Sequence, residues 1–171
     1  MRQDERIYPA PKLIIPEGFL ENKESKEQSV SPMLAETVVV YVKPDRYTEY
    51  PGYIERPIKL VSKKIRQILL KYQKDIVLKP AVLVDKENGR HEGYYLIDAP
   101  IIECAARTSK RDAYGNITEF HLDAEKTAHM RIFMDKEYKG RLIVRLDVAE
   151  SILRRKAYGI RYEKVNVIFA E

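Results

Sequence analysis

The order of apolar and polar residues predicts several short strands in the middle of the chain. Residues 37–42, Thr-Val-Val-Val-Tyr-Val, are rich in β-branched side chains, as expected of a buried strand. Residues 92–97, Glu-Gly-Tyr-Tyr-Leu-Ile, follow the turn pair Asn88-Gly89 and form a second predicted strand, with a central position in the sheet. Further short strands are expected at 101–105, 117–122 and 131–134, so this region is a meander joined by turns.

A degenerate repeat of strand, helix and strand flanks the meander. In the first copy, Ser62 is the expected helix N-cap. The apolar face of the helix follows at helical spacing, and a β-like run then covers residues 76–84. That apolar face consists of Ile65, Ile68, Leu69 and Tyr72.

The second copy begins with the predicted strand Leu142-Ile143-Val144. A helix follows, with Asp147 as its expected cap and Gly159 as the left-handed residue that ends it. Residues 160–169 then alternate like a strand. Chance similarity competes with a true repeat, because an amphipathic helix followed by a strand is a common pattern.

These elements predict an α+β fold with a mixed, mostly antiparallel sheet, flanked by two helices from two related helix–strand units. Residues 1–32 are expected to form an extended or partly disordered N-terminal arm, because prolines punctuate them and residues 21–31 lack an apolar period. Residues 33–171 then form a single domain. The arm could serve contacts in a homodimer.

Composition excludes several classes of protein. Cys104 is the only cysteine, which excludes an internal disulfide and a multi-cysteine zinc site. The three histidines, His91, His121 and His129, lack the spacing of a helical metal site, so no metal and no cofactor is expected. No apolar run is long enough for a membrane span and no signal peptide is visible, which predicts a cytoplasmic protein with no membrane partner.

Positive charge gathers near the C-terminus. The chain carries a formal net charge of +5, and residues 136–164 hold nine Lys or Arg residues against four acids. Such a basic cluster attracts nucleic acid, acidic lipid or an acidic protein. However, Arg154, Arg155 and Lys156 fall at the predicted end of a helix, where cations are solvated and complement the helix dipole.

No motif for catalysis stands out. Cys104 lies in an apolar run, and no residue in the sequence is placed to activate it as a nucleophile. Ser109 and His121 could form a hydrolase pair, but no nucleophile elbow surrounds the serine. The seven glycines form no phosphate-binding loop. Asp123, Glu125, Asp135 and Glu137 could hold a cation, although turn capping is the simpler interpretation.

An aromatic loop is a better candidate for binding. Arg46, Tyr47, Tyr50 and Tyr53 precede or surround a Pro-Gly turn, and tyrosine and arginine are enriched among the residues that dominate protein interfaces. The same tyrosines could instead cover the core, since a tyrosine can bury its ring and keep its hydroxyl in water.

The succession of segments from residue 58 to 169 resembles the immunity protein 11 family, a domain encoded beside bacterial polymorphic toxins. The resemblance is diffuse, and its most specific parts are the last two segments listed here. The matching segments are the helix at 61–72, Val-Leu-Val-Asp-Lys-x-x-Gly-Arg at 82–90, residues 92–97, Ile-Glu-Cys at 102–104 with Ser109, Leu-Asp-x-x-Lys at 122–126, Ile132-Phe133 with Leu142-Ile143-Val144, and Gly-Ile-Arg-Tyr-Glu at 159–163.

The resemblance implies a non-catalytic protein that binds a cognate toxin, and it carries over no catalytic residues. The chain departs from the family at residues 105–111, where an acidic, polar stretch is usual and Ala-Ala-Arg-Thr-Ser-Lys-Arg stands instead. If this loop contacts the toxin, through Arg107, Lys110 and Arg111, the partner differs from that of typical members. Two alternatives remain. The first is a nucleic-acid-binding domain that uses the basic cluster, and the second, less favoured one is a cysteine-dependent enzyme that uses Cys104.

Overall fold

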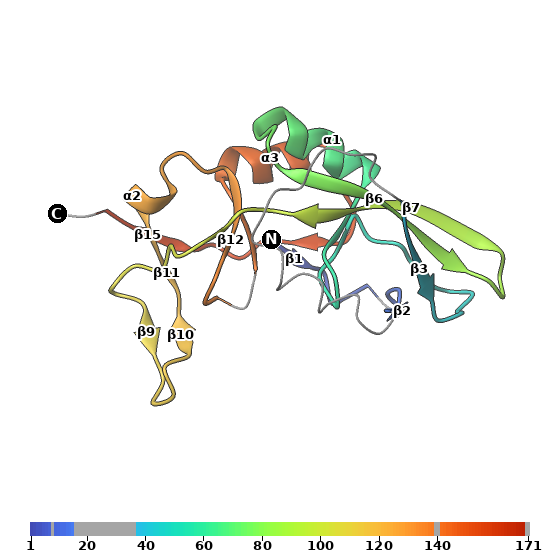
Figure 1. Cartoon of the computed structure of the whole chain (residues 1–171), viewed down its shortest axis with the longest axis horizontal. Coiled ribbons are helices and arrows are strands. Elements are labelled where there is room, and N and C mark those ends of the chain that lie inside the picture. Colours follow the sequence, from blue (N-terminus) through green and yellow to red (C-terminus); the bar gives the residue numbers. More distant parts are fainter. Residues whose placement is uncertain (8, 16–36, 139–140, 170–171) are drawn as a thin grey trace.

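A six-stranded sheet is the largest element of the fold in the computed structural model, which describes residues 1–7, 9–15, 37–138 and 141–169 (Figure 1). Its strand order is β2-β3-β6-β7-β5-β4. The strands are β2 (Leu13–Ile14), β3 (Val38–Val42), β4 (Tyr53–Ile54), β5 (Leu60–Ser62), β6 (Val77–Asp85) and β7 (Arg90–Asp98). Only β3 and β6 pair in parallel, so the sheet is mixed and mostly antiparallel, as predicted.

The hairpin of β6 and β7 forms the centre of this sheet. Its nine residue pairs run from Val77 opposite Asp98 to Asp85 opposite Arg90. The turn is closed by the Asp85 side chain, whose Oδ1 accepts a hydrogen bond from the backbone N–H of Asn88 at 3.0 Å. Gly89 adopts a φ of 64°, which suits glycine in such a turn. Because β7 lies between β6 and β5, the predicted central position of residues 92–97 is confirmed.

Two helices lie side by side on the same side of the strands (Figure 1). Helix α1 (Lys63–Tyr72) buries Ile65, Ile68 and Leu69, which is the face predicted from the sequence spacing. Helix α3 (Leu146–Arg154) buries Val148 and Ile152 in the same core. A third, short helix, α2 (Ala124–Thr127), begins after Asp123. The described residues thus form the predicted α+β fold, with one helix more than expected.

Smaller sheets complete the fold. A three-stranded sheet has the order β13-β12-β8, and three two-stranded sheets pair β1 with β14, β9 with β10 and β11 with β15. These strands are β1 (Arg2–Gln3), β8 (Ile101–Ile102), β9 (Lys110–Arg111), β10 (Ile117–Glu119), β11 (His121–Asp123), β12 (Ile132–Asp135), β13 (Leu142–Val144), β14 (Ile160–Arg161) and β15 (Asn166–Ile168).

The two predicted helix–strand units share a larger plan, a hairpin followed by a helix. In the first unit β4 pairs with β5 before α1, and Tyr53 lies opposite Val61. In the second unit β12 pairs with β13 before α3, and Ile132 lies opposite Val144. Tyr53, Val61 and Ile132 are buried in one core, and the half-buried Val144 packs against it. The repeat therefore extends one strand further back than the sequence suggested.

The final strand of the second unit differs from its prediction. Residues 160–169 do not form one strand like β6 but two, because β14 pairs antiparallel with β1 and β15 pairs in parallel with β11. The intervening residues 162–165 belong to neither ladder. Each half thus takes a different distant partner, which a local alternation of apolar residues cannot indicate.

Two details of helix α3 also differ from the prediction. Its N-cap is Arg145, while Asp147 lies in the first turn and accepts a hydrogen bond from Val148 N–H at 2.9 Å. Its left-handed terminal residue is Lys156, with φ of 50°, whose N–H donates to the Leu153 carbonyl at 2.8 Å. This arrangement is a Schellman motif. Gly159 also has a positive φ, but it lies after this motif and does not end the helix.

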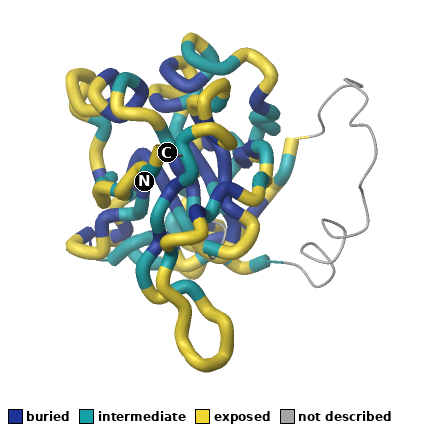
Figure 2. The backbone as a smooth tube through the Cα atoms, turned by 90° about the vertical axis from the view of Figure 1, so that its left-hand side faces the viewer, coloured by how far each residue is buried: buried dark blue, intermediate teal, exposed yellow. Residues whose placement is uncertain are grey.

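The described part of the predicted N-terminal arm is extended and packs against the domain. Strand β1 pairs with β14 and β2 with β3. Met1 is buried, and its amine donates to the Leu142 carbonyl at 2.8 Å. The predicted boundary at residue 32, and the polar stretch before it, lie outside the described residues. Figure 2 shows the buried interior and the exposed loops around it.

The described helices are all too short, or too polar, to cross a bilayer.

Gly159 lies where two chain segments approach closely, which leaves no space for a side chain. Its φ is 75°, and a Cβ added there would lie 2.4 Å from Pro51 Cβ and 2.5 Å from Ile7 Cδ1. We expect Gly159→Ala to be destabilising through both backbone strain and overpacking, by about 2–4 kcal/mol in chemical denaturation. Gly89→Ala is the matched control, since its φ is also positive but nothing lies within 4 Å. An equal loss in both variants would contradict the packing constraint.

Candidate functional site

The aromatic loop presents only part of its predicted residues to solvent. Arg46 and Tyr47 are exposed, with Tyr47 at 80%. Tyr50 is half-buried, and the guanidinium of Arg90 lies over its ring at 5.0 Å. Tyr53 is 0% exposed and forms part of the core between sheet and helices, so its side chain is not available to a partner. Tyr53 is therefore a core residue and not part of the predicted binding surface.

The basic loop at residues 105–111 leads into a protruding hairpin. Arg107, Lys110 and Arg111 are all exposed. Strands β9 and β10 project away from the body of the molecule (Figures 1 and 2), and the tip of the hairpin carries Tyr114, which is 91% exposed. The sequence does not distinguish Tyr114 from other turn residues, because its exposure depends on the projection of the whole hairpin.

The hairpin tip is held in one conformation by short-range hydrogen bonds. Asp112 Oδ1 accepts from the backbone N–H groups of Tyr114 and Asn116, each at 2.9 Å. Hydrogen bonds from the Asn116 side chain and backbone lower the pKa of Asp112, so the carboxylate stays ionised at neutral pH. Arg111 donates to the Gly115 carbonyl at 3.0 Å and pairs with Glu137, which ties the tip to the turn after β12. A tip ordered before binding loses less entropy when a partner docks.

The two predicted binding segments are not brought together. The aromatic loop follows β3 and the basic hairpin precedes β11, and Figure 1 places them at opposite ends of the long axis. They therefore form two separate surfaces.

Ser109 and His121 are in contact, but the serine bonds to the backbone of the histidine and stabilises the base of the hairpin. The Ser109 hydroxyl donates to the His121 carbonyl and accepts from its N–H, both at 3.1 Å, and does not reach the imidazole ring. The ring nitrogens instead contact Thr108 Oγ1 and Glu119 Oε1, each at 3.0 Å. This network fixes β9 and β10 against β11 and leaves the serine without a base.

Cys104 lies in a closed, acidic environment. It is 0% exposed, and both its N–H and its thiol donate to Asp135 Oδ2, at 3.0 and 3.1 Å. Burial and the adjacent Asp135 carboxylate raise the pKa of the Cys104 thiol well above its usual range. A nucleophilic cysteine needs the opposite, a cation that stabilises the thiolate. The environment of Cys104 therefore opposes the chemistry of a cysteine-dependent enzyme.

Asp135 has a structural role that explains its complete burial. Its Oδ1 accepts from the N–H groups of Glu137 and Tyr138, at 2.8 and 2.6 Å, while Oδ2 receives Cys104. Asp123 likewise caps α2 by accepting from the N–H groups of Glu125 and Lys126. The capping interpretation is thus confirmed for Asp123 and Asp135. Within the described ranges, no three His, Cys, Asp or Glu side chains gather as metal ligands.

Half of the described cations of the basic cluster are paired with carboxylates. Four of its cations form ion pairs with carboxylates, and Arg155 donates to the Ser151 carbonyl at 3.0 Å. Lys139 lies outside the described residues. The ion pairs are Lys136–Glu103, Arg141–Glu163, Arg145–Asp147 and Arg154–Glu150. Cations that already face carboxylates attract phosphate weakly, which disfavours the cluster as a nucleic-acid surface.

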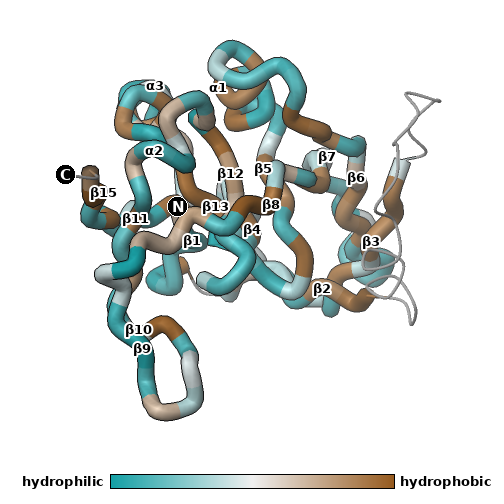
Figure 3. Tube along the Cα trace, turned by 60° about the vertical axis from the view of Figure 1, so that its left-hand side comes forward, coloured by the Kyte–Doolittle hydropathy of each residue, from teal (hydrophilic) through white to brown (hydrophobic). Residues whose placement is uncertain are grey.

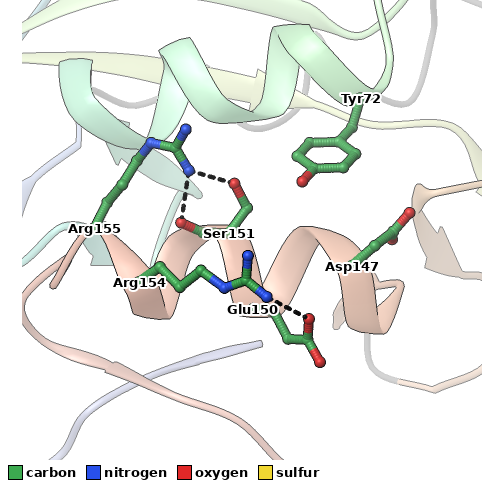
Figure 4. A pocket seen from close by; sticks show the side chains of 6 residues that line it. All are labelled: Tyr72, Asp147, Glu150, Ser151, Arg154 and Arg155. Atoms are coloured by element: carbon green, nitrogen blue, oxygen red, sulfur yellow. Dashed lines mark hydrogen bonds and ion pairs between the residues drawn. The ribbon is translucent and has the colours of Figure 1, made fainter.

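Some of these residues line a polar pocket of about 610 Å³ beside helices α1 and α3 (Figure 4). Tyr72 extends from α1 toward α3, where Asp147, Glu150, Ser151, Arg154 and Arg155 line the other side. The Ser151 hydroxyl is bonded to Arg155, and Glu150 to Arg154. Because the Ser151 hydroxyl and the Glu150 carboxylate each contact an arginine, neither is arranged as an activated nucleophile or a free base.

Comparison with known proteins adds no assignment: no family model matches the chain, and no curated protein matches its sequence.

The enclosure of Cys104 predicts an unreactive thiol. At mildly alkaline pH, the native protein should not react with Ellman's reagent, whereas the guanidinium-unfolded chain should release one equivalent, since Cys104 is the only cysteine. The Tyr114→Cys variant is the control, because a thiol at that exposed position should react at once in the native state. Native Cys104 reacting as fast as the introduced thiol would contradict the environment described here.

Proposed function

We propose that the chain is a non-catalytic binding protein, and that its partner is a cognate toxin of a bacterial polymorphic toxin system. The partner class rests on the resemblance to the immunity protein 11 family. In this proposal the chain acts in the cytoplasm of the cell that it protects, and it neutralises the toxin by occupying its surface. No reaction, metal or cofactor is required.

The protruding hairpin of β9 and β10 is the observation that supports this proposal. It combines an ordered backbone with a fully presented tyrosine, Tyr114, and an exposed arginine, Arg107. Tyrosine and arginine are the residue types that carry most of the binding energy in protein interfaces. A projecting, rigid element can also enter a concave surface such as an active-site cleft.

Electrostatics favour an acidic surface on the partner. Arg107 is exposed and has no ion pair among the described residues, while Lys110 and Arg111 are held by Glu119 and Glu137. The chain as a whole carries a net charge of +5, which accelerates encounter with an acidic protein. A nuclease toxin is a poorer fit, because its nucleic-acid site is basic and would require an acidic inhibitor.

The alternative of direct nucleic-acid binding has a separate test in the same protein. Phosphate contacts release counterions, so affinity for DNA or RNA would fall steeply with salt. Absence of binding at low salt removes this alternative without affecting the proposal.

The proposal predicts that loss of the Tyr114 side chain weakens toxin binding. Co-expression with the toxin encoded beside its gene should allow growth, and the toxin alone should kill. Tyr114→Ala should weaken the purified complex by about 2 kcal/mol or more, which is about thirtyfold in Kd, measured by calorimetry or surface plasmon resonance.

Tyr47→Ala is the matched control for this measurement. Tyr47 is also a highly exposed tyrosine, but it lies in the aromatic loop at the other end of the molecule. We expect it to leave affinity unchanged. A large loss in Tyr47→Ala with none in Tyr114→Ala would move the contact to the aromatic loop, and survival that does not depend on the chain would refute the proposed function itself.

A further inference from the structure

A second cavity, of about 700 Å³, lies apart from the protruding hairpin tip and has a different character. It is a groove bounded by α3, β11, β12, β13, β15 and the segment that leads into β15, and these elements lie together on one side of the molecule in Figure 3. Its volume falls in the range of small-molecule sites. The apolar lining residues include Phe120, Leu122, Phe133, Ile143, Leu146, Ala149 and Val167.

Parts of this apolar lining remain exposed. Leu146, at the start of α3, is 73% exposed, and Val167, on β15, is 45% exposed. Both line the groove. These two side chains leave apolar surface in contact with water. An apolar ligand in the groove would cover this surface, which favours binding.

One wall of the groove is a rigid aromatic column. The rings of Phe120 and Tyr138 are stacked, with centroids 4.3 Å apart and an angle of 6° between their planes. The Arg141 guanidinium lies over Tyr138 at 4.5 Å and donates to its hydroxyl at 2.8 Å. These contacts hold the Tyr138 ring in a defined orientation, which lowers the entropy cost of binding against this wall.

The charge of the groove lining is positive. Its one carboxylate, among the described lining residues, is Glu163, which already receives Arg141 at 2.9 Å and Arg2 at 3.2 Å. Arg145 is engaged with Asp147 at the longer distance of 3.8 Å. Lys164 is exposed and has no ion pair in the described part of the chain. An anionic group at the groove would therefore find an uncommitted cation.

We propose that this groove binds one molecule of a free long-chain carboxylate. The alkyl chain lies along the apolar lining between α3 and β15, and the carboxylate faces the exposed Lys164. The site goes beyond the proposed function and does not depend on the toxin.

Calorimetry with sodium dodecanoate, below its micelle concentration, tests the proposal on the full chain. We expect saturable binding of one dodecanoate per chain. Each methylene removed in a series of shorter carboxylates should weaken binding about fourfold, because each buried methylene contributes a constant increment. Dodecyltrimethylammonium, which has the same tail and the opposite charge, should not bind measurably.

Variants locate the binding site. Ala149→Trp should fill the groove and abolish binding, while Ala113→Trp, at the exposed hairpin tip, should have no effect. Leu146→Glu is a second test in case Ala149→Trp does not fold. Leu146 is already exposed, so the variant should fold, and its carboxylate should weaken binding by repelling the ligand. Lys164→Glu should weaken binding about tenfold, and the matched Lys64→Glu on α1 should not.

Four outcomes would overturn the proposal. The first is no saturable binding of dodecanoate, and the second is equal binding of the alkylammonium. The third is binding that Leu146→Glu and Lys164→Glu leave unchanged. The fourth is binding only to vesicles of anionic lipid and not to the monomeric carboxylate, which would make the surface a membrane contact.

Discussion

The close approach of two turns, at Pro51-Gly52 and Tyr158-Gly159, is the contact on which the rest of the architecture depends. Gly52 N–H donates to the Tyr158 carbonyl at 2.7 Å, and a Cβ on Gly52 would lie 2.9 Å from that same oxygen. The backbones can meet at this distance only because neither glycine carries a side chain. The contact joins the segment after α3 to the segment before β4, which is to say the two halves of the repeat.

Three further segments form hydrogen bonds at this contact. Gly52 accepts from Ser62 N–H at the start of α1, and Gly159 accepts from Asp4 N–H of the N-terminal segment. The Tyr94 hydroxyl on the central strand β7 donates to the Pro51 carbonyl at 2.6 Å. With these links in place, the hairpin–helix units face one another and fill a single core. Two units that share a core cannot unfold independently, which favours a cooperative transition.

The sequence indicates elements whose stability is local, and it misses those that depend on distant partners. The apolar spacing of Ile65, Ile68 and Leu69 identifies α1, and Asn88-Gly89 identifies the central hairpin, because helix periodicity and turn chemistry are written in neighbouring residues. In contrast, β14 and β15 depend on pairing with β1 and β11. No pattern within 160–169 specifies either partner.

The same distinction applies to the candidate sites. Composition singled out two candidate segments, but it could not tell that Tyr53 turns into the core while Tyr47 remains outside. Nor could it identify Tyr114, whose presentation follows from the hairpin, or the groove, whose lining residues come from elements spread over most of the chain. Sites that are assembled from distant segments become visible only when the fold brings those segments together.

The enclosure of the single cysteine beside Asp135 has a consequence for the chain as a population of molecules. Two folded copies cannot be joined through Cys104, because neither sulfur reaches the surface. Only chains that have opened can form a covalent dimer. The amount of disulfide-linked dimer that accumulates under oxidising conditions therefore increases with the frequency at which the folded protein opens. Dimer formation through Cys104 can thus be used to measure unfolding.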